Sequence, residues 1–140
     1  MLAFFAIILP LVLLPVAAYT VDAAMVSGRA ASLHAATAVA AETASQQLSV
    51  TAKRAGGELA LDTGSAQAAA RLTLGAEEPA ASIESISVNG AEISVTASEV
   101  VDIPFKLFGG PITLRASASA RLVAGYDNPS SLLPLPMSTF

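Results

Sequence analysis

Residues 1–21 read MLAFFAIILPLVLLPVAAYTV and contain no charged side chain, and Asp22 is the first charged residue of the chain. About 20 apolar residues in a helix span the hydrocarbon core of a bilayer, so this stretch predicts a membrane helix. Any break should fall at Pro10 or Pro15, because proline lacks a backbone N–H. The alternative is a cleaved signal peptide, with Val16-Ala17-Ala18 as its cleavage site. Because no Lys or Arg precedes the apolar run, we favour a retained helix.

The helical pattern continues well beyond the apolar run. Residues 22–55 contain no proline, and 12 of these 34 residues are alanine, the best helix former. The basic residues Lys53 and Arg54 stand just before a pair of glycines, which is typical of the end of a helix. We therefore expect residues 1–55 to form a long N-terminal helical segment, nearly continuous over residues 1–53.

The next 70 residues, 56–125, predict a small α+β head. The stretch Asp62-Thr63-Gly64-Ser65 offers N-cap side chains for a short helix over Ala66 to Leu74, which should stop at Gly75. The pattern then changes to a period of two, and the dipeptide Asn89-Gly90 predicts a two-residue hairpin turn. Residues 112–123 alternate between apolar and polar side chains, which is typical of a half-buried antiparallel strand.

Two segments have no clear pattern of their own. Residues 100–111 carry Phe105 and Phe108, and they are either an edge strand packed on the helix or a contact surface between subunits. The tail, residues 126–140, is rich in proline and should be extended, either docked on a neighbouring copy or disordered. A head of this size has a marginal core, so the second half of the long helix is expected to cover its antiparallel sheet.

The composition excludes several classes of function. Seven basic and eleven acidic residues argue against a nucleic-acid partner, whose phosphates require Lys and Arg. The chain has no cysteine and one histidine, His34, so we expect no catalytic residues, no metal site and no cofactor. Glu77 and Glu78 are expected to be solvated surface residues. Asp22 and Arg29 are expected either at the boundary where the helix leaves the membrane or as charge partners between subunits.

This layout resembles the type IV pilin superfamily, and its details are similar to the TadE-like pseudopilins of tight-adherence (Tad) pilus systems. The similarity lies in Phe4-Phe5-Ala6-Ile7-Ile8-Leu9-Pro10, in the alanine-rich stretch after Asp22 and in the strand over residues 112–120. The sequence differs from the family pattern at two points. The early glutamate of the family falls at Phe4, and no glycine for prepilin peptidase precedes Gly28.

The resemblance implies a structural subunit that polymerises through its hydrophobic N-terminal helix into a surface pilus filament. It implies a chain held in the cytoplasmic membrane before assembly, with other copies, the pilus assembly machinery and prepilin peptidase as partners. The alternative is a monomeric membrane-anchored or secreted envelope protein that presents a small β-rich domain. The residues expected in the membrane or the filament core are Phe4, Phe5, Ile7, Ile8, Leu9, Pro10, Leu11, Leu13, Leu14 and Pro15. The residues expected at helix–helix and subunit contacts are Asp22, Arg29, Ala36, Phe105 and Phe108.

Overall fold

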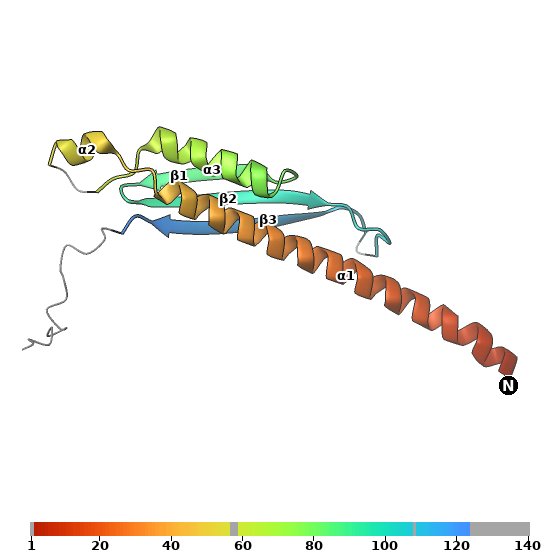
Figure 1. The fold of residues 1–140 in the computed structure, drawn as a ribbon. Coiled ribbons are helices and arrows are strands. Elements are labelled where there is room, and N and C mark those ends of the chain that lie inside the picture. The colour runs from red at the N-terminus through yellow and green to blue at the C-terminus, as the bar shows by residue number, and fades with distance from the viewer. Residues whose placement is uncertain (1, 57–58, 108, 124–140) are drawn as a thin grey trace, which may run out of the picture.

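The structure is a computed structural model that describes residues 2–56, 59–107 and 109–123 (Figure 1). Three helices are followed by three strands: α1 (Leu2–Ser45), α2 (Val50–Arg54), α3 (Thr63–Glu77), β1 (Ser82–Asn89), β2 (Glu92–Val101) and β3 (Ile112–Arg121). The fold is α+β, as the sequence predicts. The tail expected to be extended, residues 126–140, lies outside the described residues.

Helix α1 has two parts with different surroundings. Its 44 residues span about 66 Å at 1.5 Å per residue. The C-terminal half lies across the sheet, and the N-terminal half projects beyond it (Figure 1). Pro10 and Pro15 lie inside α1, so neither proline ends the helix.

The long helix ends earlier than expected, at Ser45 rather than near residue 53. Residues 46–49 leave the helix because their backbone groups bond to the segment before α3. The N–H of Ser49 donates to Ala60 O over 2.9 Å, and the N–H of Asp62 donates to Gln47 O over 2.8 Å. The side chain of Ser49 then caps α2 by accepting a hydrogen bond from the N–H of Ala52. Tertiary hydrogen bonds thus override the helix propensity of this stretch.

Helix α3 begins within the stretch predicted to cap it and ends later than expected. The carboxylate of Asp62 accepts a hydrogen bond from the N–H of Ser65 over 2.7 Å, and this bond lowers the pKa of that carboxyl. Gly75 does not end the helix, which runs to Glu77, just before Glu78 and Pro79. A single glycine costs a helix about 1 kcal/mol, whereas proline disfavours the helical conformation of the residue before it.

The three strands form one antiparallel sheet in the order β1-β2-β3. Asn89 pairs with Glu92, so the two turn residues are Gly90 and Ala91 rather than Asn89 and Gly90. Gly90 has φ +62°, and Ala91 is not among the described residues with positive φ, which fits a type II′ turn. A turn at Asn89-Gly90 would pair Ile86 with Ile93, whereas the observed partner of Ile86 is Val95, two residues further along. The apolar face is unchanged because the side-chain period is two.

The segment considered as an edge strand, residues 100–111, begins with the last two residues of β2, and the described residues 102–107 and 109–111 that follow form no strand. These described residues are called the β2–β3 loop below. The two strands that flank it pair directly, and Val101 faces Ile112 at the end of the ladder. The alternation expected over residues 112–123 is confirmed by β3, whose odd-numbered residues are exposed.

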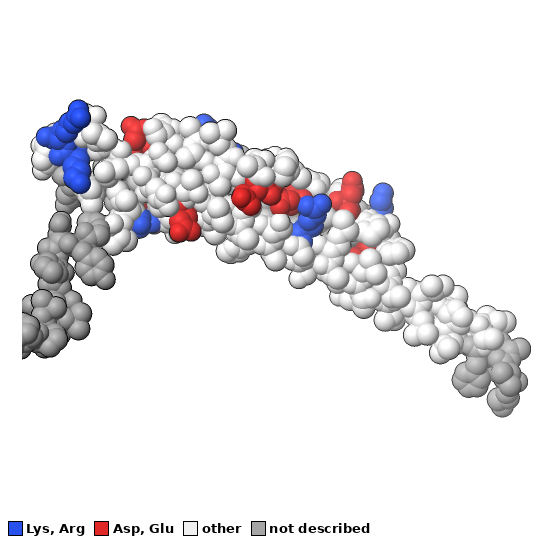
Figure 2. All heavy atoms as spheres, in the orientation of Figure 1, with Lys and Arg blue, Asp and Glu red and all other residues white. Residues whose placement is uncertain are grey.

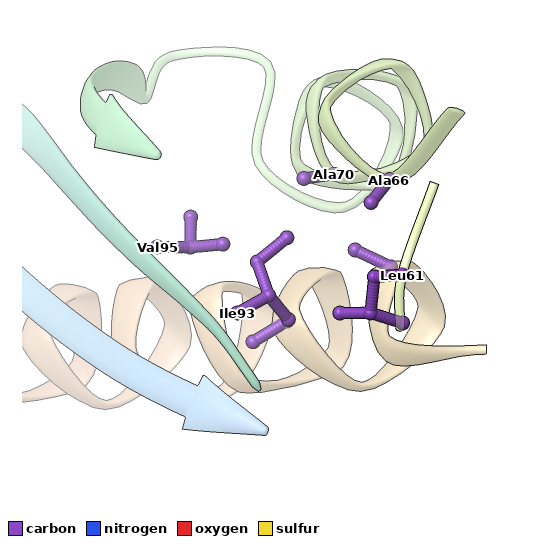
Figure 3. Close-up of a cluster of buried hydrophobic side chains, with 7 residues drawn as sticks. Leu61, Ala66, Ala70, Ile93 and Val95 are labelled. Carbon is purple, nitrogen blue, oxygen red and sulfur yellow. The ribbon is translucent and has the colours of Figure 1, made fainter. Parts of the chain in front are cut away.

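The core lies between the sheet and the two longer helices. Helix α1 packs over β2 and β3, and α3 lies beside α1 on the same face of the sheet (Figure 1). In Figure 3, Ile93 and Val95 of β2 point toward the helices, where Ala66 and Ala70 of α3 and Leu61 meet them. A second buried cluster joins Leu33, Ala36 and Ala40 of α1 to Leu74, Ala97 and Ala116. As expected, the second half of α1 covers the sheet.

The hairpin turn can be tested with two single substitutions in the full chain in detergent micelles. Gly90→Val should lower the free energy of unfolding by about 1–2 kcal/mol, because a side chain in the left-handed region is strained even where space is open. Asn89→Val should leave it nearly unchanged, because Asn89 is an ordinary strand residue. Urea denaturation measures both, and a larger loss for Asn89→Val would contradict the observed turn.

Candidate functional site

The first charged side chain of the chain lies at the level where α1 leaves the head. Asp22 is fully buried, at 0% exposure. Its Oδ1 accepts a hydrogen bond from the N–H of Phe105 over 3.1 Å, and its Oδ2 accepts one from the N–H of Leu107 over 3.2 Å. Lys106, between the two donors, has φ +52°. Successive N–H groups that converge around a left-handed residue form a natural anion cradle.

This contact explains how a carboxylate is tolerated in the interior. A buried charge is costly unless hydrogen bonds replace its water, and here two backbone donors do so. The same bonds satisfy two N–H groups of the β2–β3 loop. Asp22 therefore fastens this loop to α1, next to the last residue of the charge-free stretch. From the sequence, Asp22 is expected at a membrane boundary or at a contact between subunits. The contact observed in the structure lies within the chain.

A second polar contact joins three elements further along α1. Arg29 Nη1 lies 3.0 Å from Glu78 Oε1 and 3.7 Å from Glu99 Oε1. The hydroxyl of Ser32 donates a hydrogen bond to Glu78 Oε2 over 2.6 Å. Glu78 follows α3 and Glu99 lies on β2, so the cluster links α1, α3 and the sheet. Figure 2 shows acidic and basic atoms side by side in the middle of the molecule.

The expectation that Glu78 is a solvated surface residue was wrong. The side chains of Glu78 and Glu99 are 8% and 3% exposed, whereas that of Arg29 is 46% exposed. Glu99 Oε2 is buried without a hydrogen-bond partner among the described residues. Because water screens the half-exposed guanidinium, the cluster adds more to the orientation of the helix on the head than to net stability.

The burial of Glu99 could have been predicted from the sequence. Strand β2 places every second residue from Ile93 to Val101 on the buried face, and Glu99 is in phase with them. An acidic residue in an apolar row indicates a buried charge with a partner. Glu78 gave no such signal, because its burial depends on where the end of α3 meets α1.

The N-terminal half of α1 is apolar on all sides and uncovered by the described part of the head. The exposed fraction of its large side chains ranges from 37% to 71%: Phe4, Ile7, Ile8, Leu9, Leu11, Val12, Leu13, Leu14, Val16 and Tyr19. Pro10 and Pro15 are exposed as well, while the side chain of Phe5 lies outside the described set. Figure 2 shows no charged atoms on this projecting segment. The helix is long and apolar enough to cross a membrane, which suggests a membrane anchor or a signal sequence.

The face of α1 turned away from the head carries small residues. Ala24, Gly28, Ala31 and Ala35 are exposed and follow one another at helical spacings of three and four. A Cβ built on Gly28 meets no atom within 4 Å. Ala36, by contrast, is 5% exposed and packs inside the head, so its contacts are within the subunit.

The β2–β3 loop displays apolar side chains beside the Asp22 contact. Phe105 is 54% exposed and Leu107 is 48% exposed, whereas Ile103 is buried at the base of the loop. Phe108, expected to share this surface, lies outside the described residues.

Within residues 2–56, 59–107 and 109–123, no three His, Cys, Asp or Glu residues gather where they could hold a metal ion. His34 lies on an exposed position of α1. Three surfaces are the candidate functional features: the apolar half of α1, its small-residue face and the β2–β3 loop.

Comparisons with protein-family models, with curated proteins and with solved structures find no match to this chain. The architecture itself is pilin-like, because a long apolar N-terminal helix packs against a three-stranded antiparallel sheet.

The Asp22 contact makes a direct prediction for the full chain in detergent micelles. Asp22→Ala should lower the free energy of unfolding by about 2 kcal/mol, since it leaves two backbone donors without their charged acceptor. Hydrogen exchange at the amides of Phe105 and Leu107 should accelerate. The free energy of unfolding of Asp22→Asn should lie between those of Asp22→Ala and the unaltered chain, because the amide of Asn retains one acceptor oxygen.

The matched control is Asp102→Ala, which removes an exposed carboxylate from the same loop. It should leave both amides protected. Equal exchange rates in Asp22→Ala and the unaltered chain would show that the carboxylate does not hold the loop.

Proposed function

We propose that this chain is a structural subunit that polymerises through its hydrophobic N-terminal helix into a surface filament of the pilus type. The supporting observation is the exposed apolar half of α1, which projects from a head that has no described element to cover it. Before assembly the subunit would be held in the cytoplasmic membrane. After assembly it would be part of a filament at the cell surface. Its role would be architectural, without catalysis, metal or cofactor.

The energetic argument concerns where these side chains can be buried. Burial of a Val, Leu, Ile or Phe side chain is worth about 1.5–3 kcal/mol. The eight exposed side chains of these types from Phe4 to Leu14 would therefore contribute on the order of 10 kcal/mol or more to the free energy of burial, less the cost of ordering. Lipid provides that environment before assembly. In a filament, the helices of neighbouring copies would provide it.

The small-residue face of α1 supports contact between copies. Small side chains let helix backbones approach closely, and Ala24, Gly28, Ala31 and Ala35 are all exposed on the face opposite the head. Because the head occupies the other face, a second helix can approach α1 here without displacing it. By family resemblance, the partners during assembly would be the pilus assembly machinery and prepilin peptidase.

The alternative function is a monomeric envelope protein whose apolar helix is only an anchor or a signal sequence. Such a protein would also expose apolar side chains on residues 2–21. It would not require small residues on the outer face of α1 alongside the head. The two functions therefore differ in what a bulky residue on that face should do.

Two helical glycines make this test clean. Gly28 on α1 and Gly75 on α3 both have open space around an added Cβ. Gly28→Leu and Gly75→Leu should both fold with equal or higher stability, because glycine is a poor helix former. Gly28→Leu should form few or no filaments, counted by electron microscopy of cells that carry the assembly machinery, and Gly75→Leu should assemble normally.

Normal assembly of Gly28→Leu would remove this face of α1 from the subunit contacts. If the unaltered chain stays monomeric in the membrane, the alternative function is favoured. Ala36→Trp is the less informative change, since Ala36 is buried in its own head and a bulky residue there disturbs folding first.

A further inference from the structure

The exposed apolar loop between β2 and β3 lies at a defined height along α1. Asp22 bonds to the backbone of Phe105 and Leu107, so this loop sits at the level of residue 22. Residues 2–21 below that level are all uncharged and cover about 30 Å of helix, which equals the thickness of the hydrocarbon core. In a chain anchored by α1, the loop would therefore lie where the hydrocarbon meets the headgroups.

We propose that the tip of this loop, residues 105–107, is a second membrane contact that inserts into the interface of the bilayer around α1. The proposal rests on the membrane stage of the proposed function. It adds a partner for the loop, a lipid surface that contains anionic headgroups, and a role in setting the height and tilt of the head.

The arrangement of side chains at the tip suits an interface. Phe105 and Leu107 are exposed on either side of Lys106. The backbone N–H groups of Phe105 and Leu107, which would be costly to bring near hydrocarbon unpaired, are bonded to Asp22. The apolar side chains can thus enter the acyl region while the loop backbone stays satisfied.

Charge supports the same orientation. Lys106 places a cation at the level of the lipid headgroups, where a long basic side chain can extend toward anionic groups. The neighbouring acid Asp22 is buried, and the exposed acid of the loop, Asp102, stands four residues before Lys106, directly after β2. Tyr19, three residues before Asp22, adds an aromatic side chain of the kind enriched at membrane interfaces.

Exposed apolar side chains of α1 lie on both sides of Asp22 in the sequence. Val21 and Met25 flank Asp22 in the sequence, and they are 49% and 37% exposed. The end of the head near the loop is where the charged atoms stop in Figure 2, and the surface beyond it is uncharged as far as the described residues extend. A bilayer placed around residues 2–21 therefore meets the loop without burying an ion pair.

The absence of tryptophan from the chain allows a direct test in vesicles. Single-tryptophan variants of the full chain are reconstituted into phosphatidylcholine–phosphatidylglycerol vesicles, with or without brominated acyl chains that quench on contact. Phe105→Trp reports on the loop. Val12→Trp reports on the span, and Leu72→Trp, at a 76% exposed position of α3, is the matched control for an exposed apolar residue on the head.

The expected result is that brominated lipid quenches Phe105→Trp to an extent approaching that of Val12→Trp, with a blue-shifted emission, while Leu72→Trp is unaffected. Adding Lys106→Glu to Phe105→Trp should reduce the quenching in anionic vesicles and have less effect in neutral ones. This dependence on lipid charge would not arise from a loop that is merely close to the membrane.

Two other outcomes would overturn the proposal in different ways. Quenching of Val12→Trp without quenching of Phe105→Trp would leave the membrane anchor intact and reject the loop contact. If Phe105→Trp then became shielded in assembled material, the loop would be a subunit contact. Quenching of neither variant would reject the loop contact together with the membrane stage of the proposed function.

Discussion

The packing of α1 across the apolar face of the sheet is the interaction on which the rest of the structure depends. Three short strands and α3 cannot close a core without it, because one face of the sheet would stay open to solvent. The residues of α1 that fill this role are mostly small, with Leu33 as the one large fully buried side chain among them. Alanine at Ala36, Ala40, Ala41 and Ala44 brings the helix close to the strands. Because one face of α1 is packed on the head, only the opposite face and the projecting N-terminal half of α1 can contact other partners.

Two polar contacts then determine how the helix sits on the head. Packing of alanine against strands specifies register weakly, since small side chains interlock little. The hydrogen bonds from Asp22 to the loop and the ion pairs of Arg29 connect fixed positions on α1 to fixed positions on the head. Both contacts lie toward the end at which the helix emerges. The projecting half of α1 is therefore held at a defined angle to the head, as the proposed polymerisation would require.

Much of this fold could be predicted from residue patterns alone. The charge-free stretch 1–21, the alanine-rich continuation as far as Ser45 and the alternation over residues 112–123 are local signals, and the structure forms the helix and the strand that they predict. The end of α1 at Ser45 could not be predicted, since it depends on hydrogen bonds to residues 60–62. Neither could the burial of Glu78, which follows from its contacts with Arg29 and Ser32 of α1. The site showed the same limit: Asp22 and Arg29 could be singled out as isolated charges on an apolar helix, but their partners lie far away in the chain.

We propose that copies of this chain assemble with the exposed half of α1 inside and the heads outside. Electron cryo-microscopy of the material formed by the full chain with its assembly machinery tests it most directly. The expected result is a helical filament. In it, residues 2–21 of each copy pack around the axis, and the outer surface of the three-stranded sheet faces solvent. Filaments built by contacts between heads, with α1 outside the packed core, would contradict it, as would a chain that remains monomeric in the membrane.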